Sequence, residues 1–307
     1  MGIIPIFAAS MNQHTLNKTY SFEGRGLHTG KYVRISVKPA PANTGVVFVR
    51  TDLGNARIEA RALNVDMTRR STRLGDGKAS VRTVEHLLSA LTGFGVDNAT
   101  VEVDGPELPI LDGSAGPYAL AFSGDSLVEQ EAERALLRPV REFTVRNKYG
   151  GWIKVTPAEE FSIDLTIDFN SKVLGRQTVH YDESVDYASQ IAPCRTFCFL
   201  HEIFPQLMLG MIRGGDLDNA LIAVERPVSA FRLKLMSKCL GRPGLEVSPE
   251  GYIGRPLIFS DECGRHKMLD LIGDLRLAGG FVAAHVEAFK PGHALNTLAA
   301  KELMNNL

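Results

Sequence analysis

The sequence predicts an α+β fold made of two similar sandwich domains, in each of which a sheet packs on helices. Each half of the 307-residue chain contains several β-prone runs, then a helical segment, a further strand and a second helix. In both halves the first helical segment carries a histidine in its first turn, His86 and His266. We therefore expect the helices of the two halves to face each other, with the sheets outside and the active site at the domain interface.

The first half begins with short β-prone runs separated by Gly and Pro turn signals over residues 14–62. A polar stretch rich in Arg, Thr and Gly, residues 68–78, is expected to be a loop. Thr83 is then a candidate N-cap for a helix over residues 84–91, and residues 98–103 resume a strand.

The second half repeats this order after an acidic, polar stretch, residues 124–134, that we expect to be an exposed linker. Its expected elements are strands at residues 152–155 and 161–169, a helix at 266–277, a strand at 281–289 and a last helix at 294–305. The predicted domains are an N-terminal extension at residues 1–13, a first domain at 14–134, and a second domain at 135–307 with an apolar insert around 197–215.

The composition is that of an ordinary globular protein, with 34 Lys and Arg against 35 Asp and Glu and a net charge of −1. This balance argues against a nucleic-acid partner, so a polyanionic substrate must be bound by local basic residues. The four cysteines lack the spacing of a zinc knuckle or a disulfide framework, which favours a cytoplasmic location. The apolar opening, residues 2–9, is too short to span a membrane and lacks a basic leader, so at most peripheral membrane contact is expected.

Three polar residues, His266, Asp270 and Asp274, follow one another at the helical spacing i, i+4 and i+8. At about 100° per residue their side chains drift by only about 80° around the axis, so they share one face. If the two histidine-bearing helix starts meet, His86 joins His266 and Asp270 as a third ligand. Two imidazoles and one carboxylate suit a catalytic zinc ion because they leave its fourth position open. The spacing fits equally well with His86 packing at a helix start and Asp270 pairing with a Lys or Arg.

Two further residues are candidates for acid–base chemistry beside such a metal. Glu85 directly precedes His86, so it is a candidate general base, although the helix dipole also favours a glutamate at this position. His293 follows a glycine and opens the last helix, where it is a candidate general acid for a leaving amine. Asp274 is the candidate partner that keeps His293 protonated and oriented. The plainer alternatives are a neighbour of a helix cap for His293 and a surface acid for Asp274.

Five motifs occur in order along the chain: Thr83-Val-Glu-His-Leu-Leu-Ser-Ala90, Leu111-Asp-Gly-Ser-Ala-Gly-Pro117, Arg195-Thr196-Phe197, His266-Lys267-x2-Asp270-x3-Asp274 and Gly292-His293-Ala-Leu-Asn296. Together they resemble the UDP-3-O-acyl-N-acetylglucosamine deacetylases of lipid A biosynthesis, over residues 14–306. The resemblance implies a cytoplasmic hydrolase that removes acetate from a UDP-linked, 3-O-(3-hydroxyacyl)-N-acetylglucosamine, the committed step of that biosynthesis. It also implies one catalytic Zn²⁺ on His86, His266 and Asp270, with Glu85 as base and His293, paired with Asp274, as acid.

The resemblance also implies roles in binding the substrate. Thr196 is implied to donate a hydrogen bond to the oxyanion of the reaction. Lys267 and Lys290 match lysines near the diphosphate, and Phe169 and Phe197 match aromatic residues around the nucleotide. The apolar insert, with Phe199 and Ile203, is implied to form a passage for the acyl chain, although core packing explains apolar side chains equally well.

Three alternatives stay open at this point. A zinc deacetylase could act on a different acylated amino sugar, and the same scaffold could be a non-catalytic module that binds a nucleotide sugar. A set of two histidines and one aspartate also accepts Fe²⁺ or Co²⁺. Some members of the family carry a fused hydroxyacyl-carrier-protein dehydratase domain, so this chain is a candidate part of a longer product.

Overall fold

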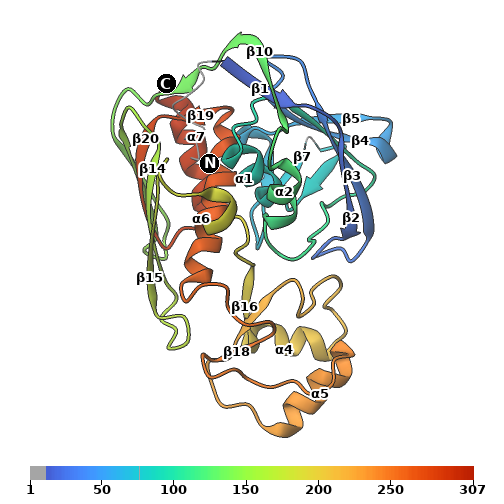
Figure 1. Ribbon diagram of the computed structural model, residues 1–307. Helices are drawn as coiled ribbons and strands as arrows, with labels where there is room; N and C mark the ends of the chain where they lie inside the picture. The colour runs from blue at the N-terminus through green and yellow to red at the C-terminus, as the bar shows by residue number, and fades with distance from the viewer. Residues whose placement is uncertain (1–11, 76) are drawn as a thin grey trace.

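A five-stranded sheet forms the first half of the computed structural model, which describes residues 12–75 and 77–307 (Figure 1). Its strands are β2 (Tyr20–Arg25), β3 (Tyr32–Pro39), β4 (Val46–Arg50), β5 (Ala56–Glu59) and β9 (Ala99–Val103). They lie in the order β2-β3-β9-β4-β5, and neighbours are antiparallel except for the parallel pair β4 and β9. The last strand of this sheet in chain order, β9, is therefore inserted between two hairpins.

A second five-stranded sheet has the same topology. Its strands are β12 (Phe143–Arg146), β13 (Trp152–Pro157), β14 (Ser162–Asp168), β15 (Arg176–Tyr181) and β20 (Ala284–Phe289). The order is β12-β13-β20-β14-β15, and again only the central pair, β14 and β20, is parallel. The shared strand order confirms the predicted fold of two similar α+β halves. The predicted domain boundary near residue 135 stays a prediction.

The helices of the two halves face each other between the sheets (Figure 1). Each half contributes one helix before the inserted strand, β9 or β20, and one after it: α1 (Glu85–Gly93), α2 (Gly116–Phe122), α6 (Glu262–Leu275) and α7 (His293–Asn305). Helix α1 packs against α6, and α6 and α7 cover the second sheet. Every residue of α1 is buried. The buried apolar side chains of these four helices and of both five-stranded sheets belong to one continuous core.

Several further elements of the two halves are short. They are β6 (Val65–Met67), β7 (Arg73–Gly75) and β8 (Ser80–Arg82), the pair β11 (Leu136–Leu137) and β19 (Phe281–Val282), α3 (Tyr187–Gln190), and 3-10 turns at Thr51–Leu53, Ala62–Asn64 and Arg276–Ala278. Thr83 does not cap α1 as the sequence predicted. Its backbone has a positive φ of 59°, and its hydroxyl donates instead to Glu107 Oε1 at 3.0 Å. In the described part of the chain, no helix is long and apolar enough to cross a membrane.

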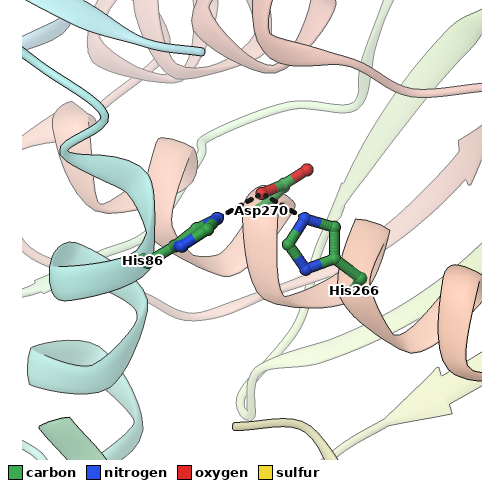
Figure 2. Close-up of side chains that lie close together, drawn as sticks. All are labelled: His86, His266 and Asp270. Atoms are coloured by element: carbon green, nitrogen blue, oxygen red, sulfur yellow. Dashed lines mark ion pairs between the residues drawn. The ribbon is translucent and has the colours of Figure 1, made fainter. Parts of the chain in front are cut away.

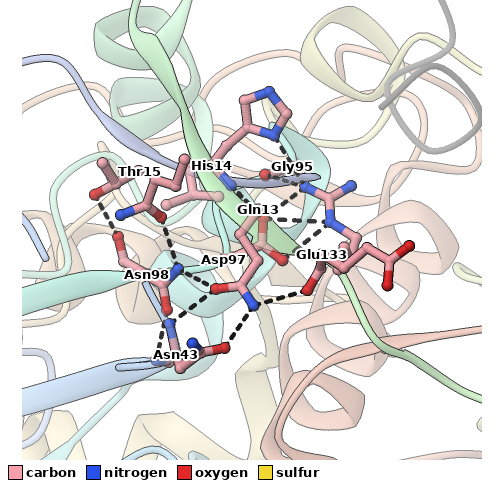
Figure 3. A network of polar contacts seen from close by, with 12 residues as sticks. Gln13, His14, Thr15, Asn43, Gly95, Asp97, Asn98 and Glu133 are labelled. Atoms are coloured by element: carbon pink, nitrogen blue, oxygen red, sulfur yellow. Dashed lines mark hydrogen bonds and ion pairs between the residues drawn. The ribbon is translucent and has the colours of Figure 1, made fainter. Parts of the chain in front are cut away.

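The stretch predicted as an exposed linker is largely a strand. Residues Leu127–Glu133 form β10, which pairs antiparallel with β1 (Asn12–Leu16). A polar network fixes this pair to the first half: Gln13 Nε2 donates to Asn43 Oδ1 at 2.8 Å and to the Glu133 carbonyl at 3.0 Å (Figure 3). Arg134 is buried and donates to Asp97 Oδ2 at 2.6 Å. The acidic composition indicated a linker. Local sequence could not predict this strand, because its pairing partner lies more than 100 residues earlier.

A small subdomain extends from the second half beyond helices α1 and α6, at the bottom of Figure 1. It consists of β16 (Phe197–Phe199), α4 (Leu200–Met208), β17 (Leu221–Ala223), α5 (Ala230–Leu240) and β18 (Tyr252–Ile253). Its three strands form a separate sheet in the order β16-β17-β18, and part of its apolar side chains, among them Leu200, Ile222 and Met236, form a second core. These elements continue well past the apolar stretch 197–215. Helix α4 runs through Pro205 without ending there.

Candidate active site

Helices α1 and α6 bring together the three residues predicted as metal ligands. His86 lies in the first turn of α1, and His266 and Asp270 lie one turn apart on α6. Both histidines point their Nε2 atoms at one carboxylate oxygen: Asp270 Oδ1 lies 3.7 Å from His86 Nε2 and 3.6 Å from His266 Nε2 (Figure 2). All three side chains are buried, and their ligand atoms lie within 4.8 Å of one another.

This arrangement fits a metal ion rather than an internal hydrogen-bond network. Asp270 Oδ1 is buried and has no hydrogen-bond partner, and the gaps to the two imidazoles are too long for hydrogen bonds. Bonds of about 2.0–2.2 Å at tetrahedral angles place ligand atoms about 3.3–3.6 Å apart, close to the observed spacing. The cluster is therefore a candidate site for one metal ion.

Neighbouring groups orient these ligands and set their charge. His266 Nδ1 lies 3.0 Å from the Cys194 carbonyl, so the ring donates there and keeps its Nε2 lone pair for a metal. Burial lowers the pKa of His86 to about 3 and also lowers that of His266, so both rings are neutral. Burial alone would raise the pKa of Asp270, but Lys267 and the histidines hold it below its usual range. Lys267 Nζ donates to Asp270 Oδ2 at 2.8 Å.

A second group of titratable residues lies beside the candidate metal site. His293 Nε2 is 3.9 Å from Glu85 Oε1, and His293 Nδ1 is 3.0 Å from Asp274 Oδ2. Burial raises the pKa of Glu85 to about 8, against the opposing effect of His293. Burial alone would lower the pKa of His293, but Asp274 and Asp270 raise it to about 9. A carboxyl group and an imidazole with pKa values near or above neutrality are suited to exchanging protons.

A cavity of about 550 Å³ opens onto both groups. The sequence-predicted residues that line it are Glu85, His86, Phe169, Thr196, Phe197, Phe199, Ile203, His266, Lys267, Asp270 and His293. Two predicted residues are not among the lining residues. Asp274 lies behind His293, and Lys290 forms an ion pair with Asp168 at 3.3 Å.

The walls of the cavity differ in chemistry. Three aromatic rings, Phe169, Phe197 and Phe199, contact one another edge to face at 5.5–6.3 Å, and Lys267 Nζ lies 5.6 Å from the ring centre of Phe197. Toward the small subdomain the lining becomes mostly apolar, with Glu202, Gln206, Arg213 and Asp216 among these apolar residues: Ile203, Leu207, Met211, Ile212, Leu217, Ile222 and Leu240. The cavity therefore joins a polar, titratable end to an apolar branch.

Sequence reasoning missed two residues of the site. Asn296 Nδ2 donates to Asp274 Oδ2 at 2.9 Å, and its position one turn after His293 on α7 was the available signal. Thr72 contacts both Glu85 and Asp274, but it lies in a stretch whose only sequence signal was that of a polar loop. Nothing in the spacing of the chain pointed to it.

The fold and the site together define a class of protein: two repeated α+β halves with a candidate metal site, and titratable residues beside it, at their interface. The model of the family "UDP-3-O-acyl N-acetylglycosamine deacetylase" matches residues 13–235 and 245–305. The chain is 40% identical to the UDP-3-O-acyl-N-acetylglucosamine deacetylase of Myxococcus xanthus, over 97% of this chain and 88% of that one. The corresponding protein of a Nostoc species is 38% identical, over 96% and 99%. The chain belongs to this family.

Two further relatives are longer than this chain. It is 41% identical to a "Bifunctional enzyme LpxC/FabZ" of Porphyromonas gingivalis and 37% identical to one of Bacteroides thetaiotaomicron. The match spans 96% and 97% of this chain but only 65% of each of these relatives. The chain therefore covers slightly less than two thirds of their length.

Proposed function

We propose that the protein is a zinc-dependent hydrolase that removes acetate from UDP-3-O-(3-hydroxyacyl)-N-acetylglucosamine in lipid A biosynthesis. The observation that carries the proposal is the unpartnered Asp270 Oδ1 between His86 and His266, with Glu85 and His293 beside it. Family membership supports the substrate. The proposed setting is the cytoplasm, with no nucleic-acid partner.

The three ligands would hold one Zn²⁺, whose positive charge lowers the pKa of water to about 7 and polarises a carbonyl oxygen. The neutral imidazoles of His86 and His266 provide lone pairs, and the ionised Asp270 balances part of the charge. The Cys194 carbonyl keeps His266 in the required tautomer. Fe²⁺ or Co²⁺ would also suit this donor set.

Glu85 is the proposed general base, and the charge of a metal ion beside it would oppose the effect of burial on its pKa and favour the ionised carboxylate. It accepts a proton from the water that attacks the acetamide carbonyl, while the Thr196 hydroxyl donates a hydrogen bond to the developing oxyanion. The backbone of Thr196 is fixed for this role because its amide donates to the Gly113 carbonyl at 2.8 Å and its carbonyl accepts from Leu221 at 2.9 Å.

His293 is the proposed general acid. Its raised pKa keeps the ring protonated near neutrality, and Asp274 fixes the ring through Nδ1 so that Nε2 faces the cavity. From there the ring protonates the departing amine as the carbon–nitrogen bond breaks. Acetate and the free glucosamine are the products.

The cavity offers a place for each part of the substrate. We assign the nucleotide to the end with Phe169, Phe197 and Lys267, with Lys290 near the diphosphate. Phe199 and Ile203 begin the apolar branch, which suits a fatty acyl chain because each buried CH₂ contributes about 0.8 kcal/mol. Fusion to a dehydratase domain stays a prediction.

The test is acetate release and metal content measured in one sample of metal-replete protein, with UDP-linked and UDP-free acylated substrates. We expect release from the UDP-linked substrate and roughly one metal ion per chain. Glu85→Ala should keep the metal and lose turnover by orders of magnitude. Metal-loaded wild-type protein that releases no acetate would overturn the proposal, and equal rates on both substrates would overturn the nucleotide assignment.

A further inference from the structure

Thr72 connects the two carboxylates of the candidate active site. It lies between β6 and β7 and is fully buried. Its hydroxyl donates to Asp274 Oδ1 at 2.6 Å, and its backbone amide donates to Glu85 Oε2 at 3.1 Å. One residue of the first half therefore contacts both the proposed base and the carboxylate that holds the proposed acid.

The hydroxyl of Thr72 supports a side of Asp274 that the other neighbours leave open. His293 and Asn296 both lie on α7, and both contact Oδ2. Among the described residues, the hydrogen bond to Oδ1 comes from Thr72 alone. Without that hydroxyl, Oδ1 would be a buried acceptor without a partner, and the carboxylate could rotate away from the His293 ring.

We propose that Thr72 is a positioning residue, which orients Asp274 and so keeps His293 aligned beside Glu85 at the cavity. This rests on the proposed function, since it concerns the alignment of that reaction's acid and base. Thr72 does not line the cavity and therefore acts through the two carboxylates rather than on the substrate.

The backbone of Thr72 is held independently of its side chain. Its carbonyl accepts from the Thr83 amide at 2.9 Å, and the hydroxyl of the preceding Ser71 accepts from Arg82 Nε at 2.6 Å. A change of the Thr72 side chain should therefore leave the amide contact to Glu85 in place. This separates the contribution of the hydroxyl from that of the loop.

The experiment compares Thr72→Val, which removes the hydroxyl at nearly constant volume, with Thr72→Ser, which keeps it. Thr92→Val is the matched control, because Thr92 is also buried but its hydroxyl donates to the Leu88 carbonyl within α1. We expect Thr72→Val to lower kcat by about 10- to 100-fold with little change in KM or metal content. Thr72→Ser and Thr92→Val should stay within about threefold of wild type. If the valine variant does not fold, Thr72→Ala provides the same test.

A double-mutant cycle shows whether Thr72 acts through Asp274. If it does, Thr72→Val should have little further effect in an Asp274→Ala background, whereas a general structural role would give additive losses. An NMR signal of the His293 Nδ1 proton in metal-free protein provides a readout without turnover. That signal should shift or broaden in Thr72→Val and persist in Thr92→Val.

Three results would overturn the role of Thr72: turnover of Thr72→Val equal to that of Thr92→Val, a Thr72→Ser variant as impaired as Thr72→Val, or additive losses in the cycle. An inactive wild-type protein would instead contradict the proposed function. In that case the His293 signal still decides whether the Thr72 hydroxyl holds the pair in place.

Discussion

Asp270 divides its two carboxylate oxygens between two tasks. Oδ1 faces the imidazoles of His86 and His266, and Oδ2 accepts the hydrogen bond from Lys267. The lysine compensates a charge that burial alone would disfavour, so the carboxylate is ionised before any metal binds. The ligand set is therefore preorganised.

His266→Ala should abolish metal binding, because the remaining His86 and Asp270 provide only two of the three ligands. The measurement is metal content per chain after dialysis, by elemental analysis. His285→Ala is the matched control: His285 lies on β20, is partly exposed and has Ser162 as a partner at 2.8 Å. Full metal content in His266→Ala would show that the ion binds elsewhere.

The sequence predicted the residues whose positions depend on local spacing. His266, Asp270 and Asp274 share a helix face whatever the helix packs against, and Glu85 must lie close to His86 because the two residues are adjacent in the chain. Thr72 could not be predicted in this way. Its contacts depend on the path of an irregular segment that meets Asp274 more than 200 residues later, and no periodicity encodes such a path.

At the scale of elements, a glycine allows the two ligand-bearing helices to approach each other. A Cβ atom added at Gly273 of α6 would overlap the Glu85 carbonyl at the start of α1. The backbones of the two helices are thus in direct contact at the level of the site, which keeps His86 within reach of Asp270. The atoms nearest to the added Cβ are backbone atoms, so no side chain could rotate away to make room for it.

Gly273→Ala should therefore destabilise the protein although alanine is the better helix former. The higher helix propensity of alanine adds about 1 kcal/mol to the free energy of unfolding, whereas forcing the two backbones apart lowers it by about 1–3 kcal/mol. We also expect weaker metal binding, because the added methyl group would move His86 on α1 away from His266 and Asp270 on α6. Competition with a chelator measures this effect. The control is Gly292→Ala, where nothing lies within 4 Å of the added Cβ. An unchanged denaturation midpoint in Gly273→Ala would contradict this account.

The small subdomain supplies the apolar branch of the cavity, so its side chains should set which acyl chains fit. Ile203→Phe places more volume in the branch and should lower kcat/KM more for long acyl chains than for short ones. Rates on a series of acyl lengths measure this effect. Ile258→Phe is the control, because Ile258 is 48% exposed and does not line the cavity. Equal losses at every chain length would place the acyl chain elsewhere.

Element prediction failed where pairing is remote. The acidic composition of residues 124–134 indicated a linker, yet Leu127–Glu133 pairs with Asn12–Leu16 and forms β10. By contrast, α1 was predicted from local start and stop signals and α6 from helical spacing, although Thr83 does not cap α1 and α6 begins one turn earlier than expected, at Glu262. Local patterns are enough to predict a helix with clear spacing. Whether an ambiguous segment forms a strand depends on a pairing partner that is distant in the sequence.

At the scale of the whole molecule, a metal ion would link the two halves, because its ligands lie on α1 of the first half and α6 of the second half. A ligand that binds only the folded state stabilises it, by about 2.7 kcal/mol when present at 100 times its Kd. We expect a chelator to lower the Tm and zinc to restore it. Glu85→Ala should respond in the same way, and His266→Ala should show no chelator effect. A Tm that is indifferent to the chelator in metal-loaded protein would rule out this link.

The two halves repeat one topology, yet they do not contribute equally to the ligand cluster. When the histidines of the two helices are matched, Ala90 of α1 corresponds to Asp270 of α6. Each half therefore provides one histidine, and the second half alone provides the carboxylate. Because both matched histidines belong to the same cluster, the repeat creates one shared centre between the halves rather than one in each. Neither half holds all three ligands without the other.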